Sequence, residues 1–221
     1  MIEFAGVSAG PLRDASFAIP PGTAAGLVTS SESATDLVVR LLVGAERPAA
    51  GSVLLFGQAV ADLPETEALA LFTRLGVAWP DGGLVSNLKS WENILLPLWY
   101  HGERRAAERE REVLELLGRL GVPAERAPGL LQTSPGRLDV RERRIVGIVR
   151  ALLRDPEVLV LAGQLEGLDE EACGRIRETA RWRHEGGGGR TTLWVTSDER
   201  GLVGTGTTLL LRQGSDGRVT A

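Results

Sequence analysis

The 221-residue sequence predicts an α/β fold, with a mostly parallel sheet covered by helices on both faces. The first observation is a set of short, continuous apolar runs at 24–28, 158–161 and 192–196, which are typical of buried parallel strands. The second is that segments with apolar residues at helical spacing separate these runs. The alternation predicts one α/β domain, with 158–161 placed next to 24–28 in the sheet.

The elements follow from local patterns along the chain. Alternating residues over 2–7 predict an edge strand, and a polar loop over 29–35 leads to a helix that we expect to begin at Asp36, a favourable helix-start residue. The Asp155-Pro156 pair ends a helix, because the residue before proline avoids helical geometry. The other expected elements are strands over 16–19 and 51–57 and helices over 103–120 and 140–154.

Composition limits the functional classes. The net charge of −4 and the pI of about 5.4 give no electrostatic support to a nucleic-acid partner. The single cysteine, Cys173, indicates a reducing compartment, and His101 and His184 lie too far apart in sequence to suggest a metal site. No apolar run reaches the roughly 18 residues that cross a bilayer, and no signal peptide is evident, so we expect a cytoplasmic location.

Several short strings, in order along nearly the whole chain, resemble ABC-transporter ATPases. Each string is weak alone, but together they occur at the family's spacings. The strings are Gly26-Leu27-Val28, Leu41–Gly44 with Gly51–Val53, Glu92–Leu98, Arg150–Leu152 with Asp155–Leu159, and Gly167–Asp169.

The resemblance implies an ABC-type P-loop NTPase fold. Its RecA-like core, with a small antiparallel β subdomain, would hold residues 1–85 and 150–221, and a helical subdomain would hold 86–149. The segment 93–98 and the small size are also similar to the ATPases of lipid importers that work with MCE proteins.

The phosphate-loop positions carry unusual residues. In this family glycine N–H groups cradle the phosphates, a lysine reaches the β- and γ-phosphates, and a hydroxyl holds Mg²⁺. Counting back from Leu41–Gly44, Glu32 and Ala34 replace glycines, Thr35 replaces the lysine and Asp36 replaces the hydroxyl residue. The two acids put negative charge where a polyphosphate would sit, and the only lysine of the chain, Lys89, lies on another element.

The remaining catalytic positions are also substituted. Ala162 and Gly163 stand where the family has the Asp that holds Mg²⁺ and the Glu that polarises the attacking water. Pro80 stands at the Q-loop glutamine, Ser197 at the switch histidine, and Asp139 at the serine of the signature motif.

Two further features bear on these positions. An alternative alignment places the signature at Ser134-Pro135-Gly136, but it needs extra residues before the following helix. Only the D-loop, Leu168-Asp169, keeps the family's form.

These substitutions predict a protein that is not an enzyme and holds no cofactor or metal. We expect a structural or regulatory subunit that docks on an ABC permease at the inner face of the membrane, as a homodimer or with another ABC ATPase. The expected docking residues are Trp79, Leu84, Trp91 and Glu92, with Leu95 and Leu98 as further candidates. Two alternatives stay open: an active ATPase in which Arg40 or Arg141 supplies the missing cation, and a soluble regulator that borrowed the fold.

Overall fold

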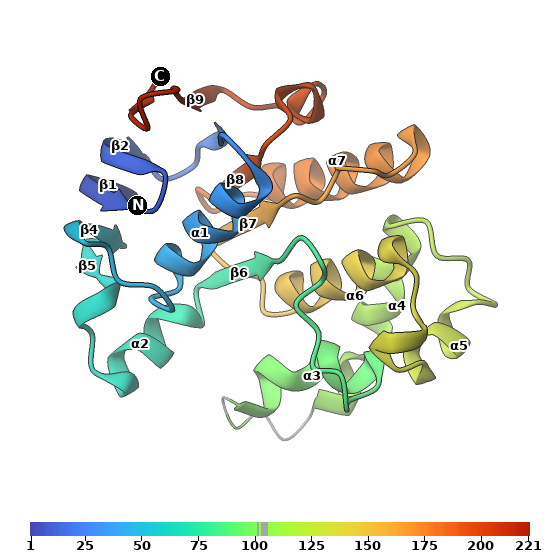
Figure 1. Ribbon diagram of the computed structural model, residues 1–221. Helices are drawn as coiled ribbons and strands as arrows, with labels where there is room; N and C mark the ends of the chain where they lie inside the picture. The colour runs from blue at the N-terminus through green and yellow to red at the C-terminus, as the bar shows by residue number, and fades with distance from the viewer. Residues whose placement is uncertain (101, 103–105) are drawn as a thin grey trace.

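The structure, a computed structural model, describes residues 1–100, 102 and 106–221, and it contains two sheets flanked by helices (Figure 1). The strands are β1 (Ile2–Ala9), β2 (Leu12–Ile19), β3 (Ala24–Val28), β4 (Ala50–Leu55), β5 (Gln58–Ala59), β6 (Leu75–Ala78), β7 (Val158–Ala162), β8 (Thr191–Thr196), β9 (Leu209–Gln213) and β10 (Val219–Thr220). The α-helices are α1 (Glu32–Leu42), α2 (Glu65–Phe72), α3 (Ser90–Tyr100), α4 (Glu110–Arg119), α5 (Ala127–Gln132), α6 (Val140–Leu152) and α7 (Glu170–Glu185). Within the described residues, no helix is both long and apolar enough to cross a bilayer.

The larger sheet confirms the expected α/β class. Its six strands run in the order β10-β9-β3-β8-β7-β6, and every pair from β9 to β6 is parallel. The smaller sheet is antiparallel, with the order β2-β1-β4-β5. The expected adjacency of 158–161 and 24–28 is wrong, because β8 lies between β7 and β3.

Side chains of the central strands alternate between two cores. Leu159 and Leu161 of β7 join a core built mainly from α3 to α7, whereas Val158 and Val160 join the core under α1 and the antiparallel sheet. Both faces of β7 are therefore buried, which is why its sequence is continuously apolar rather than alternating.

Three expectations about individual elements need correction. Residues 2–7 are not an edge strand, because β1 bonds to β2 on one side and to β4 on the other, and β4 returns to the sheet only after α1. The first helix begins at Glu32 rather than Asp36, because Ser31 already caps it by accepting a hydrogen bond from Ala34 N. In the expected helix over 103–120, residues 103–105 lie outside the described part, 106–109 form a 3₁₀ turn, and α4 begins at Glu110.

The helical layer from α3 to α6 packs below one side of the larger sheet (Figure 1). Helix α6 contacts both α3 and β6, so it links this layer to the sheet. Leu95 and Leu98 are each 1% exposed and belong to this core, so they are excluded as exposed docking residues.

Candidate functional site

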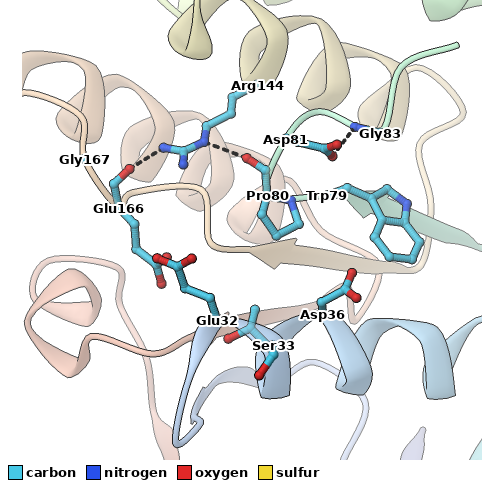
Figure 2. A pocket seen from close by; sticks show the side chains of 11 residues that line it. Glu32, Ser33, Asp36, Trp79, Pro80, Asp81, Gly83, Arg144, Glu166 and Gly167 are labelled. Atoms are coloured by element: carbon cyan, nitrogen blue, oxygen red, sulfur yellow. Dashed lines mark hydrogen bonds between the residues drawn. The ribbon is translucent and has the colours of Figure 1, made fainter. Parts of the chain in front are cut away.

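A cavity of about 690 Å³ opens at the carboxyl ends of the parallel strands, the usual place for a ligand site in an α/β sheet (Figure 2). The start of α1, the loop after β6, one arginine of α6 and the loop after β7 form its walls. The lining residues are Glu32, Ser33, Thr35, Asp36, Trp79, Pro80, Asp81, Gly83, Arg144, Glu166 and Gly167. The structure therefore brings together four of the predicted site positions, Glu32, Thr35, Asp36 and Pro80.

The phosphate-loop segment satisfies its polar groups internally. The Ser31 hydroxyl caps α1 by accepting from Ala34 N at 3.2 Å. Thr35, at the lysine position, is 1% exposed, and its hydroxyl lies 2.7 Å from that of Thr29. A short, buried hydroxyl thus occupies the position at which the sequence resemblance leads us to expect the family's lysine.

Asp36, at the Mg²⁺-ligand position, forms an ion pair with Arg40 one helical turn later. Arg40 also lies 3.6 Å from Glu46. Arg40, which could have supplied a cation in place of the lysine, is therefore already paired with the nearby carboxylates.

The end of β7 offers no carboxylate. Ala162 is fully buried in the sheet, and Gly163 has φ +58°, a conformation that disfavours other residues. A Cβ at Gly163 would also lie 3.1 Å from the Cβ of Pro80, so the two substituted positions pack closely against each other.

Gln164, which no motif pointed to, connects the ends of β6 and β7. Its side chain is 2% exposed, and its Nε2 donates to Trp79 O at 2.7 Å and to Ala162 O at 2.8 Å. No pattern of residue types indicates this role, because it depends on two strands that are distant in the chain.

Glu166 is the second residue that sequence reasoning missed. Its Oε1 accepts from Thr196 Oγ1 at 2.8 Å, from Ser197 N at 3.1 Å and from Ser197 Oγ at 3.3 Å. The carboxylate therefore ties the loop after β7 to Ser197, the switch-histidine position.

Arg144 is the third missed residue, and it is 8% exposed. Its Nε donates to Pro80 O at 2.9 Å and its NH1 to Glu166 O at 2.5 Å (Figure 2). Burial lowers the pKa of the guanidinium, and the nearby Glu166 carboxylate partly offsets that effect. Because the ordinary pKa of arginine is far above 7, the group remains a cation at neutral pH.

The pocket is acidic overall. Glu32, Asp36, Asp81 and Glu166 line it, with Arg144 as the lining cation. Among the residues that the structure describes, no group of three or more metal-ligating side chains is placed to hold an ion. At the positions expected for a phosphate-binding lysine and a Mg²⁺ ligand, Thr35 offers a bonded hydroxyl and Asp36 a carboxylate paired with Arg40.

Asp139 and Asp169 cap helices. Asp139 forms a capping box at α6, accepting from Glu142 N at 2.8 Å while Glu142 Oε2 accepts from Asp139 N at 3.1 Å. Asp169 caps α7 by accepting from Ala172 N at 2.8 Å, and Leu168 packs against the helical core.

Ser134, of the alternative signature, precedes a 3₁₀ turn. Asp139 lines a separate cavity of about 750 Å³ rather than the pocket of Glu32.

The expected docking residues differ in exposure. Trp79 lines the pocket, whereas Leu84 and Trp91 are partly buried against the helical core. Glu92 is also partly buried, and its Oε2 accepts from Lys89 N at 2.7 Å at the start of α3. The large apolar side chains that this region exposes are Val85 at 40%, Trp99 at 44% and Tyr100 at 65%.

Comparison with known proteins identifies the family: the sequence profile of ABC transporters matches residues 12–162, and the chain belongs to that family. The chain is 32% identical over 167 residues to the methionine import ATP-binding protein MetN 1 of Acinetobacter baylyi, covering 75% of this chain and 45% of the relative. It is 31% identical over 157 residues to the lipoprotein-releasing system ATP-binding protein LolD of Chromohalobacter salexigens, covering 70% and 63%. The chain thus spans about half the length of the curated relatives it matches.

Solved structures share the fold. The dimeric structure of the bacterial ABC transporter cassette MJ0796 aligns with a TM-score of 0.85 at 21% identity, covering 100% of this chain and 97% of that one. A second structure of MJ0796, in a post-hydrolysis state bound to ADP and Pi, aligns with a TM-score of 0.82 at 21% identity and the same coverage. The expected ABC ATPase fold is confirmed.

The comparisons contradict the expectation that the chain is not an enzyme. Its sequence relatives are named ATP-binding proteins, and a cassette of the same fold has been captured after hydrolysis with ADP and Pi. The expectation rested on side chains at individual positions, whereas the comparisons rest on the sequence and the fold as a whole.

Proposed function

We propose that this chain is the ATP-binding-type subunit of an ABC transport system and docks on the permease from the inner face of the membrane. Family membership supports a transport role, and one feature supports docking: the buried side chain of Asn93 holds Val85 at the surface. Asn93 Oδ1 accepts from Val85 N at 2.7 Å, and its Nδ2 donates to Val85 O and to Leu88 O, each at 3.1 Å. The side-chain amide of Asn93 fixes the backbone at Val85, so the exposed apolar side chain has a defined position. A fixed apolar side chain is a better protein-binding feature than one on a mobile loop tip.

The docking region in this proposal extends from Trp79 to Trp91, with Val85 as its exposed apolar side chain. It lies between the pocket and the helical layer. We keep the division into a core of 1–85 and 150–221 and a helical part of 86–149 as a prediction, with this region at the junction.

Membrane sedimentation from cells that carry the natural permease tests docking. Val85→Asp should move most of the protein from the membrane to the supernatant, because a carboxylate at the contact must be desolvated. Leu114→Asp is the matched control, since Leu114 of α4 is 39% exposed and lies outside the docking region. If the wild type never sediments with membranes, or if both variants behave alike, the docking proposal fails.

We also propose that the substituted positions lower the affinity of this pocket for nucleotide, compared with other family members. Each charge-assisted hydrogen bond that is lost costs about 1.5–3 kcal/mol, or roughly a 10- to 150-fold loss of affinity. The loop lacks the lysine and the Mg²⁺ hydroxyl and gains two acids, so calorimetry with Mg-ATP should show no saturation below about 1 mM.

A restoring variant provides the control for this measurement. Glu32→Gly, Ala34→Gly, Thr35→Lys and Asp36→Ser together return the family's residues, so the combined variant should gain affinity for Mg-ATP. Saturable binding by the wild type at micromolar concentration would contradict the proposal.

The cargo and the pairing remain predictions. The relatives are named for methionine import and for lipoprotein release, and we keep lipid transport as the proposed cargo class on the resemblance of segment 93–98 alone. Pairing with a second copy or with another ABC ATPase is part of the same proposal.

A further inference from the structure

Residues 78–83, which are the last residue of β6 and the loop after it (loop 78–83), are held by side chains that donate hydrogen bonds to their carbonyl groups. Gln164 Nε2 donates to Ala78 O at 3.3 Å and to Trp79 O at 2.7 Å, and Arg144 Nε donates to Pro80 O at 2.9 Å. Arg150 donates from NH1 to Gly83 O and from NH2 to Gly82 O, each at 2.8 Å. Five of the six carbonyls of the loop thus accept from three side chains.

Two of these side chains are arginines of one helix, α6. A guanidinium is planar and keeps its donors in a fixed fork, so Arg150 can bind two neighbouring carbonyls at once. Burial lowers the pKa of Arg150, and the Asp81 carboxylate raises it in part. Because the ordinary pKa of arginine is far above 7, Arg150 keeps its charge at neutral pH, and its bonds to the loop are charge-assisted.

The loop also lies directly against the backbone of α6. A Cβ at Gly82, where φ is +85°, would meet Arg143 O at 2.4 Å, and a Cβ at Gly147 would meet Gly82 O at 2.8 Å. Glycine at both positions allows this approach, which brings the loop within reach of the two arginines.

The loop connects the pocket to the docking region. Trp79, Pro80 and Asp81 line the pocket, and Val85 follows two residues after Gly83. A loop whose carbonyls already have intrachain partners needs no ligand to order it.

We propose that Arg144 and Arg150 are positioning residues that preset loop 78–83, so that the docking region binds the permease equally well with or without nucleotide. The inference rests on the proposed docking function and adds how the docking region is regulated. Binding to a preformed surface avoids the entropy cost of ordering the loop, which would otherwise have to be met at the moment of contact.

Hydrogen exchange of the full-length chain tests the positioning role. Arg150→Met and Arg144→Met should each speed exchange at the amides of Gly82, Gly83 and Val85 at least tenfold, while amides of β7 and β8 keep their rates. Arg141→Met is the matched control, because Arg141 lies on the same helix and makes none of the bonds to the loop. Arg150→Lys should recover part of the protection, since an ammonium retains charged donors.

Membrane sedimentation of the same variants, with and without Mg-ATP, tests the consequence. Wild-type binding should agree within twofold in the two conditions, and Arg150→Met should bind at least fivefold less. Exchange and binding in Arg150→Met equal to those in Arg141→Met would overturn the inference, as would exchange in β7 rising as much as in the loop. If the wild type does not sediment at all, docking itself has failed, whereas the exchange data still decide whether the arginines preset the loop.

Discussion

Replacing Arg183 by methionine should stabilise the protein. Arg183 of α7 is 2% exposed, and its Nε, NH1 and NH2 are buried without a hydrogen-bond partner. Its nearest opposite charge is Asp155 at 3.8 Å, and that carboxylate already binds Arg190 at 2.5 Å. The side chain therefore carries a buried charge with weak compensation.

The magnitude follows from the titration of this group. Burial, reinforced by the like charge of Arg190, lowers the pKa of Arg183 from its ordinary value to about 10. Each pKa unit corresponds to about 1.4 kcal/mol, so the charged form costs the folded state roughly 3 kcal/mol at neutral pH. Removing the buried charge stabilises the folded state, but imperfect packing of methionine reduces that stabilisation. We therefore expect a net stabilisation of about 2 kcal/mol. For a chain of this size that is a rise in Tm of roughly 4–8 °C.

The pH dependence gives a second readout. The folded pKa lies below the unfolded one, so above about pH 10 the unfolded state binds more protons and wild-type stability rises with pH. The stability difference between the wild type and Arg183→Met should therefore be constant below pH 9 and shrink above pH 10. Denaturant unfolding at pH 7 and at pH 10.5 measures it.

Asp155→Asn is the matched test of the charge. Asp155 has φ +48°, which asparagine tolerates, so the substitution changes charge with little backbone strain. Stability should fall by about 1–3 kcal/mol, because Arg183 and Arg190 lose their shared carboxylate. The reasoning is refuted if Arg183→Met folds but melts below the wild type.

Two other predictions follow from the site. Glu166→Ala should speed amide exchange at Ser197 at least tenfold, because it removes the acceptor of three hydrogen bonds, whereas Glu166→Gln should retain most of the protection; equal effects of the two would contradict this reading of the contact. Any dimer should be independent of nucleotide, so native mass measurements with and without Mg-ATP should agree, and a monomer that dimerises only on adding Mg-ATP would refute this expectation.

Much of the larger sheet could be predicted from sequence because its strands are buried on both faces. The run 24–28 matches β3, and 158–161 and 192–196 match β7 and β8 to within one residue. Strand order was less accessible, since a continuous apolar run carries no information about its neighbours. In the structure β8 lies between β3 and β7 and bonds to both.

The errors at α1 and β1 have local causes. Ser31 and Asp36 are both good N-cap residues, and the choice of Ser31 depends on its contact with Ala34 N. Alternation in 2–7 predicted an edge strand, but alternation reports on the two faces of a strand and not on hydrogen bonding at its two edges.

The predicted site was incomplete for a different reason. Sequence reasoning identified four of the lining residues because the family resemblance assigns a role to each of their positions. These residues are Glu32, Thr35, Asp36 and Pro80. Arg144, Gln164 and Glu166 act through backbone groups of distant segments, and such contacts leave no pattern of residue types in the sequence.

Site-specific photo-cross-linking at position 85, in cells that carry the natural permease, tests the central claim most directly. A photoreactive amino acid replacing Val85 should cross-link to a membrane-spanning permease identified by mass spectrometry, and the same group at Leu114 should not. The cross-link should have equal yield in washed membranes with and without added Mg-ATP. Cross-links from position 85 only to proteins without membrane spans, or equal permease cross-linking from position 114, would contradict the proposed docking.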